Sequence, residues 1–289
     1  MCSPAVSIFR YALLVAAVAS GLVTGELSAQ DLRQFALTSE NGETRYVVDV
    51  WLPAEYSTHE RMYPVLVMLD GEYAFDSAVQ LAAQLQRDQE VQEFIIVGVS
   101  YGVGFGKPLA AKRTPDFTPP VDSQGVIRKS ETAYYRFIRD RLLPELHGRY
   151  RIDPKNRALW GYSLSGSFAA WLNYQDPGLF EHTILASGNL IGFGILQRLS
   201  QREIFSGTGN GGRKVFISFD RTEVPDPHII DDGRRLLSSK ESFPGYEFQL
   251  LVTEGESHGS SWFTALPASL RFVFGAKRDA FPSKEIFQP

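Results

Sequence analysis

The residues around Ser163 are of the types, and at the spacing, that nucleophilic catalysis requires. A short apolar run, Arg157 to Trp160, is followed by Gly161, one further residue and Ser163. A small-residue, helix-compatible stretch, Ser165 to Leu172, comes next. A strand, a sharp turn and a helix with a serine at the apex form a nucleophile elbow. The alternative is a strand-to-helix turn rich in small residues that carries no chemistry.

The turn of an elbow strains the serine backbone, so the residues two before and two after it must be small. Gly161 meets the first demand, whereas Ser165 stands where glycine is usual, so the match to G-x-S-x-G is imperfect. Serine is still small, and Gly166 follows at once. Centring the elbow on Ser165 would leave no glycine at either flank. We therefore predict Ser163 as the nucleophile.

A serine hydroxyl needs a base to take its proton, and the base needs an orienting acid, in the chain order Ser, acid, His. His258 lies between the last predicted strand and the last predicted helix, where such a base must hang, and it is the predicted base. The alternative is a solvated loop histidine. The other four histidines come too early or occupy a helix end, a strand start or a proline-rich loop, and they are His59, His147, His182 and His228.

The acid should follow the predicted strand Val215 to Phe219. Three carboxylates lie there, and we rank Glu223 first, Asp220 second and Asp226 behind them. The alternative for each is a surface turn acid, and Asp226 could also cap a helix. Sequence alone barely separates Glu223 from Asp220.

An acyl-transfer intermediate needs backbone N–H donors aimed at its oxyanion. The amide of Leu164, directly after the serine and at a helix start, is the first predicted donor. The second should come from the Asp70-Gly71 turn, through the amide of Glu72 or Gly71. The alternative is that Asp-Gly is only a tight turn.

The elements that position these residues alternate between strand and helix patterns. The run Tyr63 to Leu69 is apolar throughout, which suits a strand buried on both faces. Alternating elements predict a mainly parallel central sheet with helices on both faces, as one α/β domain over residues 30–289. The predicted strands are Arg45–Leu52, Tyr63–Leu69, Phe94–Val99, Arg157–Trp160, Thr183–Ala186, Val215–Phe219 and Tyr246–Val252. The predicted helices are Asp76–Gln89, Thr132–His147, Ser165–Leu172, Ile229–Lys240 and Trp262–Val273.

Two segments depart from this regularity. Gly102 to Ser130 is rich in glycine and proline and is predicted to be a long irregular loop near the ligand-binding edge of the sheet. Pro144 falls within the Thr132 to His147 helix and should kink or shorten it.

The composition and the N-terminal residues limit the partners and the localisation that we expect for this protein. A hydrophobic content of 44% and a net charge of −4 over 289 residues are ordinary for a globular protein and give no basic footprint, so nucleic acid is not expected as a partner. Residues 1–29 have the pattern of an export signal, with an apolar stretch from Tyr11 to Val23 that is short for a membrane span. The alternative is an uncleaved anchor. The only cysteine, Cys2, lies in this signal, so the mature protein would have none.

Other chemistries fit less well. The sequence contains no H-E-x-x-H and no P-loop, and Gly102 to Gly106 lacks the spacing of a dinucleotide site. We therefore expect no metal and no cofactor.

Taken together, several stretches resemble the putative-esterase family of α/β-hydrolases. That family includes siderophore (enterobactin-type) esterases, S-formylglutathione hydrolases, feruloyl esterases and mycolyltransferases. The matching stretches run in family order across most of the chain and are Tyr63–Glu72, Arg113–Pro119, Phe137–Glu145, Tyr150–Asp153, Gly161–Gly166 and Glu254–Gly259. Of these, Arg113–Pro119 is especially similar to the siderophore-esterase branch.

The resemblance implies an α/β-hydrolase fold with Ser163 as nucleophile and His258 as base. The acid of the mycolyltransferase-like branch falls nearest Glu223, although some siderophore esterases use a Ser-His dyad. The oxyanion amide of that pattern is that of Glu72. Arg113 and Asp116, in the predicted loop, would shape the substrate mouth.

We therefore expect a periplasmic or secreted serine hydrolase that cleaves small carboxylic esters through an acyl-enzyme. One alternative is an acyltransferase that uses the same three residues, and another is a non-catalytic binding protein with this fold. The sequence identifies neither the ester nor the oligomeric state.

Overall fold

The structure is a computed structural model that describes residues 32–276, except 191, 202, 206–211, 225 and 239–242. The predicted export signal, residues 1–29, lies outside the described residues. Within the described part of the chain, no helix combines the length and the apolarity needed to cross a bilayer.

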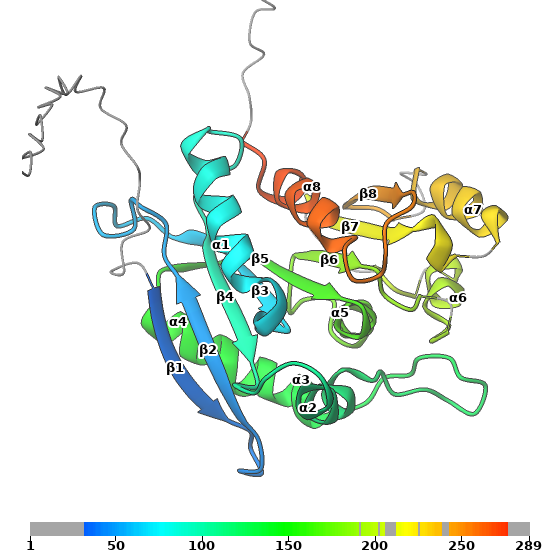
Figure 1. Cartoon of the computed structure of the whole chain (residues 1–289), viewed down its shortest axis with the longest axis horizontal. Helices are drawn as coiled ribbons and strands as arrows, with labels where there is room; N and C mark the ends of the chain where they lie inside the picture. The colour runs from blue at the N-terminus through cyan, green and yellow to red at the C-terminus, as the bar shows by residue number, and fades with distance from the viewer. Residues whose placement is uncertain are drawn as a thin grey trace, which may run out of the picture.

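A single eight-stranded sheet runs through the described residues in the order β1-β2-β4-β3-β5-β6-β7-β8 (Figure 1). From β4 to β8 in this order all neighbouring strands are parallel, and β2 runs antiparallel to both β1 and β4. The strands are β1 Leu32–Thr38, β2 Arg45–Trp51, β3 Tyr63–Leu69, β4 Ile95–Ser100, β5 Ile152–Tyr162, β6 His182–Ala186, β7 Arg213–Asp220 and β8 Tyr246–Thr253.

Helices cover both faces of the sheet (Figure 1). One face packs against α1 and α8, and the other packs against α2 to α6. The helices are α1 Gly71–Arg87, α2 Lys107–Phe117, α3 Ala133–Arg136, the π-helix η1 Phe137–Leu142, α4 Leu143–Arg149, α5 Leu164–Gln175, α6 Ile195–Ser200, the 3₁₀ helix η2 Arg221–Glu223, α7 Pro227–Ser238 and α8 Trp262–Phe274.

Strand β3 shows why its sequence is apolar throughout. Every residue of β3 is buried. Val65 and Val67 point into the core beneath α5, whereas Leu66 and Met68 point into the core beneath α1 and α8. A central parallel strand with helices on both faces must be apolar at every position, because successive side chains alternate between two dry layers.

The Thr132 to His147 prediction is resolved into one helical run with a wider turn in its middle. The amide of Leu143 donates to the carbonyl of Ile138, five residues back, directly before Pro144. A proline ring crowds the carbonyl four residues back, and a π-turn relieves that contact without ending the helix. The run continues to Arg149 as α4.

The prediction of an irregular loop from Gly102 to Ser130 is wrong in part, because α2 occupies Lys107 to Phe117. Pro108 lies in the first turn of α2, where its missing N–H costs no helical hydrogen bond. Two further short elements, β1 and α6, were not predicted. Strand β1 is an edge strand without a buried residue, so it lacks the alternation that marks a half-buried strand.

The predicted α/β-hydrolase fold is confirmed by this mostly parallel sheet and its two helical layers. The arrangement brings the carboxyl ends of β3 to β8 to one edge of the sheet. Ligand sites of such sheets lie at that edge.

We predict that Leu66→Ala destabilises the protein by about 2–5 kcal/mol, because Leu66 is wholly buried and its loss leaves a cavity in the core. The free energy of unfolding in urea measures this effect. Met62→Ala is the matched control, since Met62 is 53% exposed and its truncation should change stability little. Equal stability of the two variants would contradict the described core.

Candidate active site

Ser163 lies at the apex of a sharp turn between β5 and α5. Its backbone is left-handed, with φ 59° and ψ −123°, a region that a non-glycine residue occupies only under strain. A Cβ on Gly161 would lie 2.2 Å from the carbonyl oxygen of Ser165, and one on Gly166 would lie 2.9 Å from that of Ala186. Both glycines are therefore required by close backbone contacts.

Ser165, the departure from the usual elbow pattern, fits the turn. Its side chain is wholly buried, and its hydroxyl donates to the carbonyl of Tyr162 (2.8 Å) and accepts from the amide of Tyr162 (3.0 Å). The hydroxyl thus satisfies backbone groups of the turn that a glycine would leave to other partners. The serine supports the elbow rather than disturbing it.

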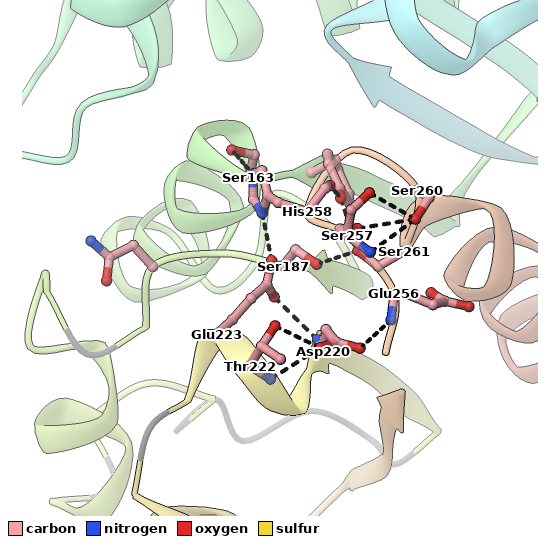
Figure 2. A network of polar contacts seen from close by, with 12 residues as sticks. Ser163, Ser187, Asp220, Thr222, Glu223, Glu256, Ser257, His258, Ser260 and Ser261 are labelled. Carbon is pink, nitrogen blue, oxygen red and sulfur yellow. Dashed lines mark hydrogen bonds and ion pairs between the residues drawn. The ribbon is translucent and has the colours of Figure 1, made fainter. Parts of the chain in front are cut away.

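Three predicted residues meet at the carboxyl edge of the sheet (Figure 2). The hydroxyl oxygen of Ser163 lies 2.8 Å from Nε2 of His258, and Nδ1 of His258 lies 2.5 Å from Oε1 of Glu223. His258 follows β8, and Glu223 ends the 3₁₀ helix η2 after β7. With Nδ1 protonated, His258 donates to Glu223 and accepts from Ser163, which is the proton arrangement of a serine hydrolase.

The ion-pair partners shift each other's pKa values. The hydrogen bond to Glu223 raises the pKa of His258 above its ordinary value of 6.5, against the opposing effect of burial. Burial alone would raise the pKa of the Glu223 carboxyl, but the hydrogen bond from His258 and that from the Asp220 amide lower it overall. The pair therefore favours an ionised carboxylate beside a basic imidazole.

Asp220, the second-ranked acid, does not contact His258 and braces the site instead (Figure 2). One carboxylate oxygen accepts from the amide (3.0 Å) and the hydroxyl (2.7 Å) of Thr222. The other accepts from the hydroxyl of Thr253 and from the amide of Glu256, both at 3.0 Å. These hydrogen bonds lower the pKa of Asp220 to about 2. The carboxylate thereby joins the end of β7 to the loop that carries His258.

Tyr162 is a supporting residue that the sequence analysis did not single out. Its hydroxyl donates to the backbone carbonyl of His258 and lies 2.9 Å from the hydroxyl of Ser261. Ser261 in turn lies 3.0 Å from the hydroxyl of Ser187, at the end of β6. The residue before the nucleophile therefore fixes the histidine loop. Its place inside the elbow motif was the available signal.

The two predicted oxyanion donors, Leu164 and Glu72, differ in their position relative to the cavities beside Ser163. Leu164 begins α5 and lines the cavity beside Ser163, and a first-turn amide has no partner within its own helix. The side chain of Glu72 turns toward β4, where it accepts from the amide of Tyr101. Glu72 is not among the described residues that line the cavities beside Ser163. Its assignment remains a prediction.

Comparison with known proteins adds a family to this geometry. The sequence profile of the putative esterase family matches residues 39–197, more than half of the chain. The chain belongs to the putative esterase family. The expected family membership is thereby confirmed, and membership makes the protein a carboxylic ester hydrolase.

Individual relatives of this esterase agree with that assignment. It is 26% identical to the ferri-bacillibactin esterase BesA of Bacillus subtilis over 229 residues, which cover 73% of this chain and 78% of BesA. It is also 26% identical to the siderophore triacetylfusarinine C esterase of Aspergillus fumigatus over 165 residues, 54% of this chain and 55% of that one. The crystal structure of the BES protein from Bacillus cereus shares the fold, with a TM-score of 0.70, 20% identity and coverage of 93% of this chain and all of the other.

Two cavities flank Ser163 and His258 in this esterase. The larger, of about 340 Å³, extends beneath α6 and α7 and is mainly apolar. The smaller, of about 200 Å³, is lined by Arg113 and by aromatic residues that include Tyr73 and Trp262. An ester held at Ser163 has space for a substituent on each side of its reacting carbonyl.

Arg113 and Asp116, the two residues of α2 that were predicted to shape the substrate entrance, have different positions in the structure. Arg113 lines the smaller cavity and is held by both oxygens of Asp70, at 2.8 and 2.6 Å. Asp116 accepts from the hydroxyls of Tyr46 (2.8 Å) and Tyr101 (2.9 Å) and is not among the described residues that line either cavity. Arg113 therefore lies within reach of a ligand, and Asp116 fastens α2 to the sheet.

We predict that Gly161→Ala lowers ester hydrolysis by at least about 100-fold or prevents soluble expression. The added Cβ would overlap the Ser165 carbonyl and force the elbow open, which misplaces the Ser163 hydroxyl. Activity and the circular dichroism of the purified variant measure this outcome. Gly178→Ala is the control, because its nearest described neighbour would lie 3.6 Å away. Full activity in Gly161→Ala would show that the turn tolerates a side chain at this position.

Proposed function

We propose that this protein is an exported serine esterase that hydrolyses small carboxylic esters through an acyl-enzyme on Ser163. The observation that carries the proposal is the unbroken line of hydrogen bonds from Ser163 through His258 to Glu223, at the edge of the sheet and open to two cavities. The strained backbone at Ser163 supports it, since strain of this kind is concentrated at reactive sites.

In the first half of the reaction, Nε2 of His258 removes the proton of the Ser163 hydroxyl as the oxygen attacks the ester carbonyl. The Glu223 carboxylate holds the imidazole in the required tautomer and stabilises the imidazolium that forms. The amides of Leu164 and Glu72 are the proposed donors to the oxyanion. His258 then returns the proton to the departing alcohol, and the acyl group stays on Ser163.

In the second half, water takes the place of the alcohol. His258 removes a proton from the water as it attacks the acyl carbonyl, and the proton passes to Ser163 when the acid leaves. A competing alcohol would give acyl transfer in place of hydrolysis, and product analysis with added alcohols distinguishes the two outcomes.

The names of the relatives guide the choice of natural substrates. The two curated relatives described above are esterases of ferri-bacillibactin and of triacetylfusarinine C. Siderophore esters are therefore the first natural substrates to assay. Export rests on the signal pattern of residues 1–29 alone, and it places the reaction in the periplasm or outside the cell.

We predict that Ser163→Ala abolishes hydrolysis of p-nitrophenyl acetate, with a loss of about 10,000-fold or more in kcat, because the acyl group has no oxygen to attach to. The melting temperature should not fall, since the substitution removes one hydroxyl from a strained turn. Ser165→Ala serves as the neighbouring control and should keep measurable activity. Turnover in Ser163→Ala at the level of the unmodified protein would exclude this serine.

The pH dependence follows from the His258–Glu223 pair. The base must be neutral, so kcat/KM is lost as pH falls through the pKa of His258, which Glu223 raises above 6.5. We predict that Glu223→Gln lowers kcat/KM by about 100- to 10,000-fold and moves the acid limb of the pH profile to lower pH, because the imidazole then protonates less readily.

Asp220→Asn is the control for this experiment. Asp220 does not contact His258, so the acid limb should move far less than in Glu223→Gln, even if the weakened link between the two loops lowers kcat/KM and the melting temperature. Profiles of kcat/KM between pH 4 and 9 measure both variants. An acid limb that does not move in Glu223→Gln would reject Glu223 as the partner of the base.

A further inference from the structure

The larger cavity beside Ser163 has a polar end and an apolar body. Its polar lining residues are Ser163, Ser187, Asn189, Glu223 and His258, at the end where the reaction is proposed to occur. Among the nineteen lining residues that the structure describes, twelve are apolar. No lysine or arginine is among the described residues that line it. The apolar residues offer dispersion contacts, and the described lining residues that can carry a charge, Glu223 and His258, both lie at the polar end.

The apolar body is built by a stripe on each of two helices and by the strands beneath them. Ile230, Gly233 and Leu237 recur on one face of α7, at three- and four-residue steps. Leu196 lies at the start of α6, and Phe193 lies in the segment before it. Figure 1 shows α6 and α7 at the β8 end of the sheet.

The opposite face of α7 is charged and exposed, which fixes how the helix sits. Asp231, Asp232, Arg234 and Arg235 are all exposed, with Arg234 paired to Asp231 and Arg235 paired to Asp232. The apolar stripe of α7 therefore faces the cavity because its other side belongs to solvent.

From this construction we infer that one substituent of the natural ester is an uncharged hydrocarbon group of roughly six to ten carbons, which fills the larger cavity while the carbonyl lies at Ser163. The volume of about 340 Å³ bounds the size, because a carbon of a packed chain takes about as much space as a water molecule, ~30 Å³. The whole cavity would hold about eleven carbons on this scale, and the polar end that receives the ester group takes part of that space. The inference rests on the proposed function and names the substrate class of the same site. The hydrocarbon could belong to the acyl side or to the alcohol side of the ester.

Two substrate series test the inference and tell the sides apart. In the first, p-nitrophenyl esters lengthen from acetate to dodecanoate. In the second, alkyl acetates lengthen from methyl to dodecyl. We expect kcat/KM to rise about fourfold for each added methylene in one series and to level off near eight to ten carbons. The series that rises identifies the side. No rise in either series would overturn the inference.

Gly233→Leu tests the cavity itself. Gly233 lies within α7 and lines the cavity, and a Cβ added there meets no described atom within 4 Å. The larger side chain should fill the cavity and lower the octanoate-to-acetate ratio of kcat/KM, or the corresponding alkyl ratio, by at least tenfold. Activity on the acetate supplies the denominator of the ratio, and circular dichroism shows that the variant is folded. An unchanged ratio in the folded variant would contradict the inference.

Gly148→Leu is the matched control. Gly148 is an exposed helical glycine of α4 with equally open space around it, and it is not a lining residue of either cavity. Its ratio should equal that of the unmodified protein. Leu250→Ala changes the cavity in the opposite sense and should move the optimum to longer chains.

The failures of the two proposals are distinguishable. Acetate hydrolysis that survives Ser163→Ala removes the proposed function. If acetate hydrolysis depends on Ser163 but neither substrate series shows a chain-length dependence, only the inference of a hydrocarbon substituent is rejected.

Discussion

The carboxylate of Asp220 holds together the two loops on which the geometry of the site depends. Glu223 lies on the turn after β7, and His258 lies on the loop after β8, so their separation is set by whatever joins those turns. Asp220 accepts hydrogen bonds from Thr222 on the first turn and from Thr253 and Glu256 at the start of the second. All of its acceptor positions are directed to fixed partners, and its low pKa keeps it ionised at any ordinary pH. Tyr162 and Ser261 hold the same histidine loop from the side of the elbow. The imidazole is thereby located from two directions, although its own ring is half exposed to solvent.

Much of the fold could be predicted because a parallel sheet leaves a strong mark in the sequence. Strand β3 was predicted with both of its boundaries, since a strand that is buried on two faces can carry only apolar residues. The meeting of Ser163, His258 and an acid from the turn after β7 followed from chain order, because the carboxyl ends of parallel strands reach the same edge. Helix α2 was missed because its prolines favour a loop, and only the structure shows Pro108 in the first turn, where a proline is tolerated. Strand β1 was missed because it has no buried face to create an alternating pattern.

The site was less predictable where tertiary contacts decide a role. Asp220 and Glu223 are three residues apart at the end of the same strand, and they form a capping box. The Asp220 carboxylate accepts from backbone amides of η2, and the Glu223 carboxylate accepts from the backbone amide of Asp220. Both are carboxylates close to the end of β7, so only the direction of each side chain shows that Glu223 binds His258 and that Asp220 joins the two loops. Arg113 and Asp116 were paired by their motif, yet one lines a cavity and the other binds two tyrosine hydroxyls. The larger cavity is assembled by α6, α7 and the ends of several strands, and no local sequence pattern predicts an empty space between packed elements.

Helix α7 has a place in the molecule that sets it apart from the rest of the site. The groups that hold Ser163, His258 and Glu223 come from the ends of β5, β7 and β8, and none of those described is supplied by α7. The helix lines the larger cavity but does not position the three residues, and its solvent-exposed face is free to vary in charge. Substitutions along its inner stripe can accordingly remodel which esters are accepted while the machinery that breaks them is left intact. Within one lineage, selectivity and chemistry can thus diverge at separate paces.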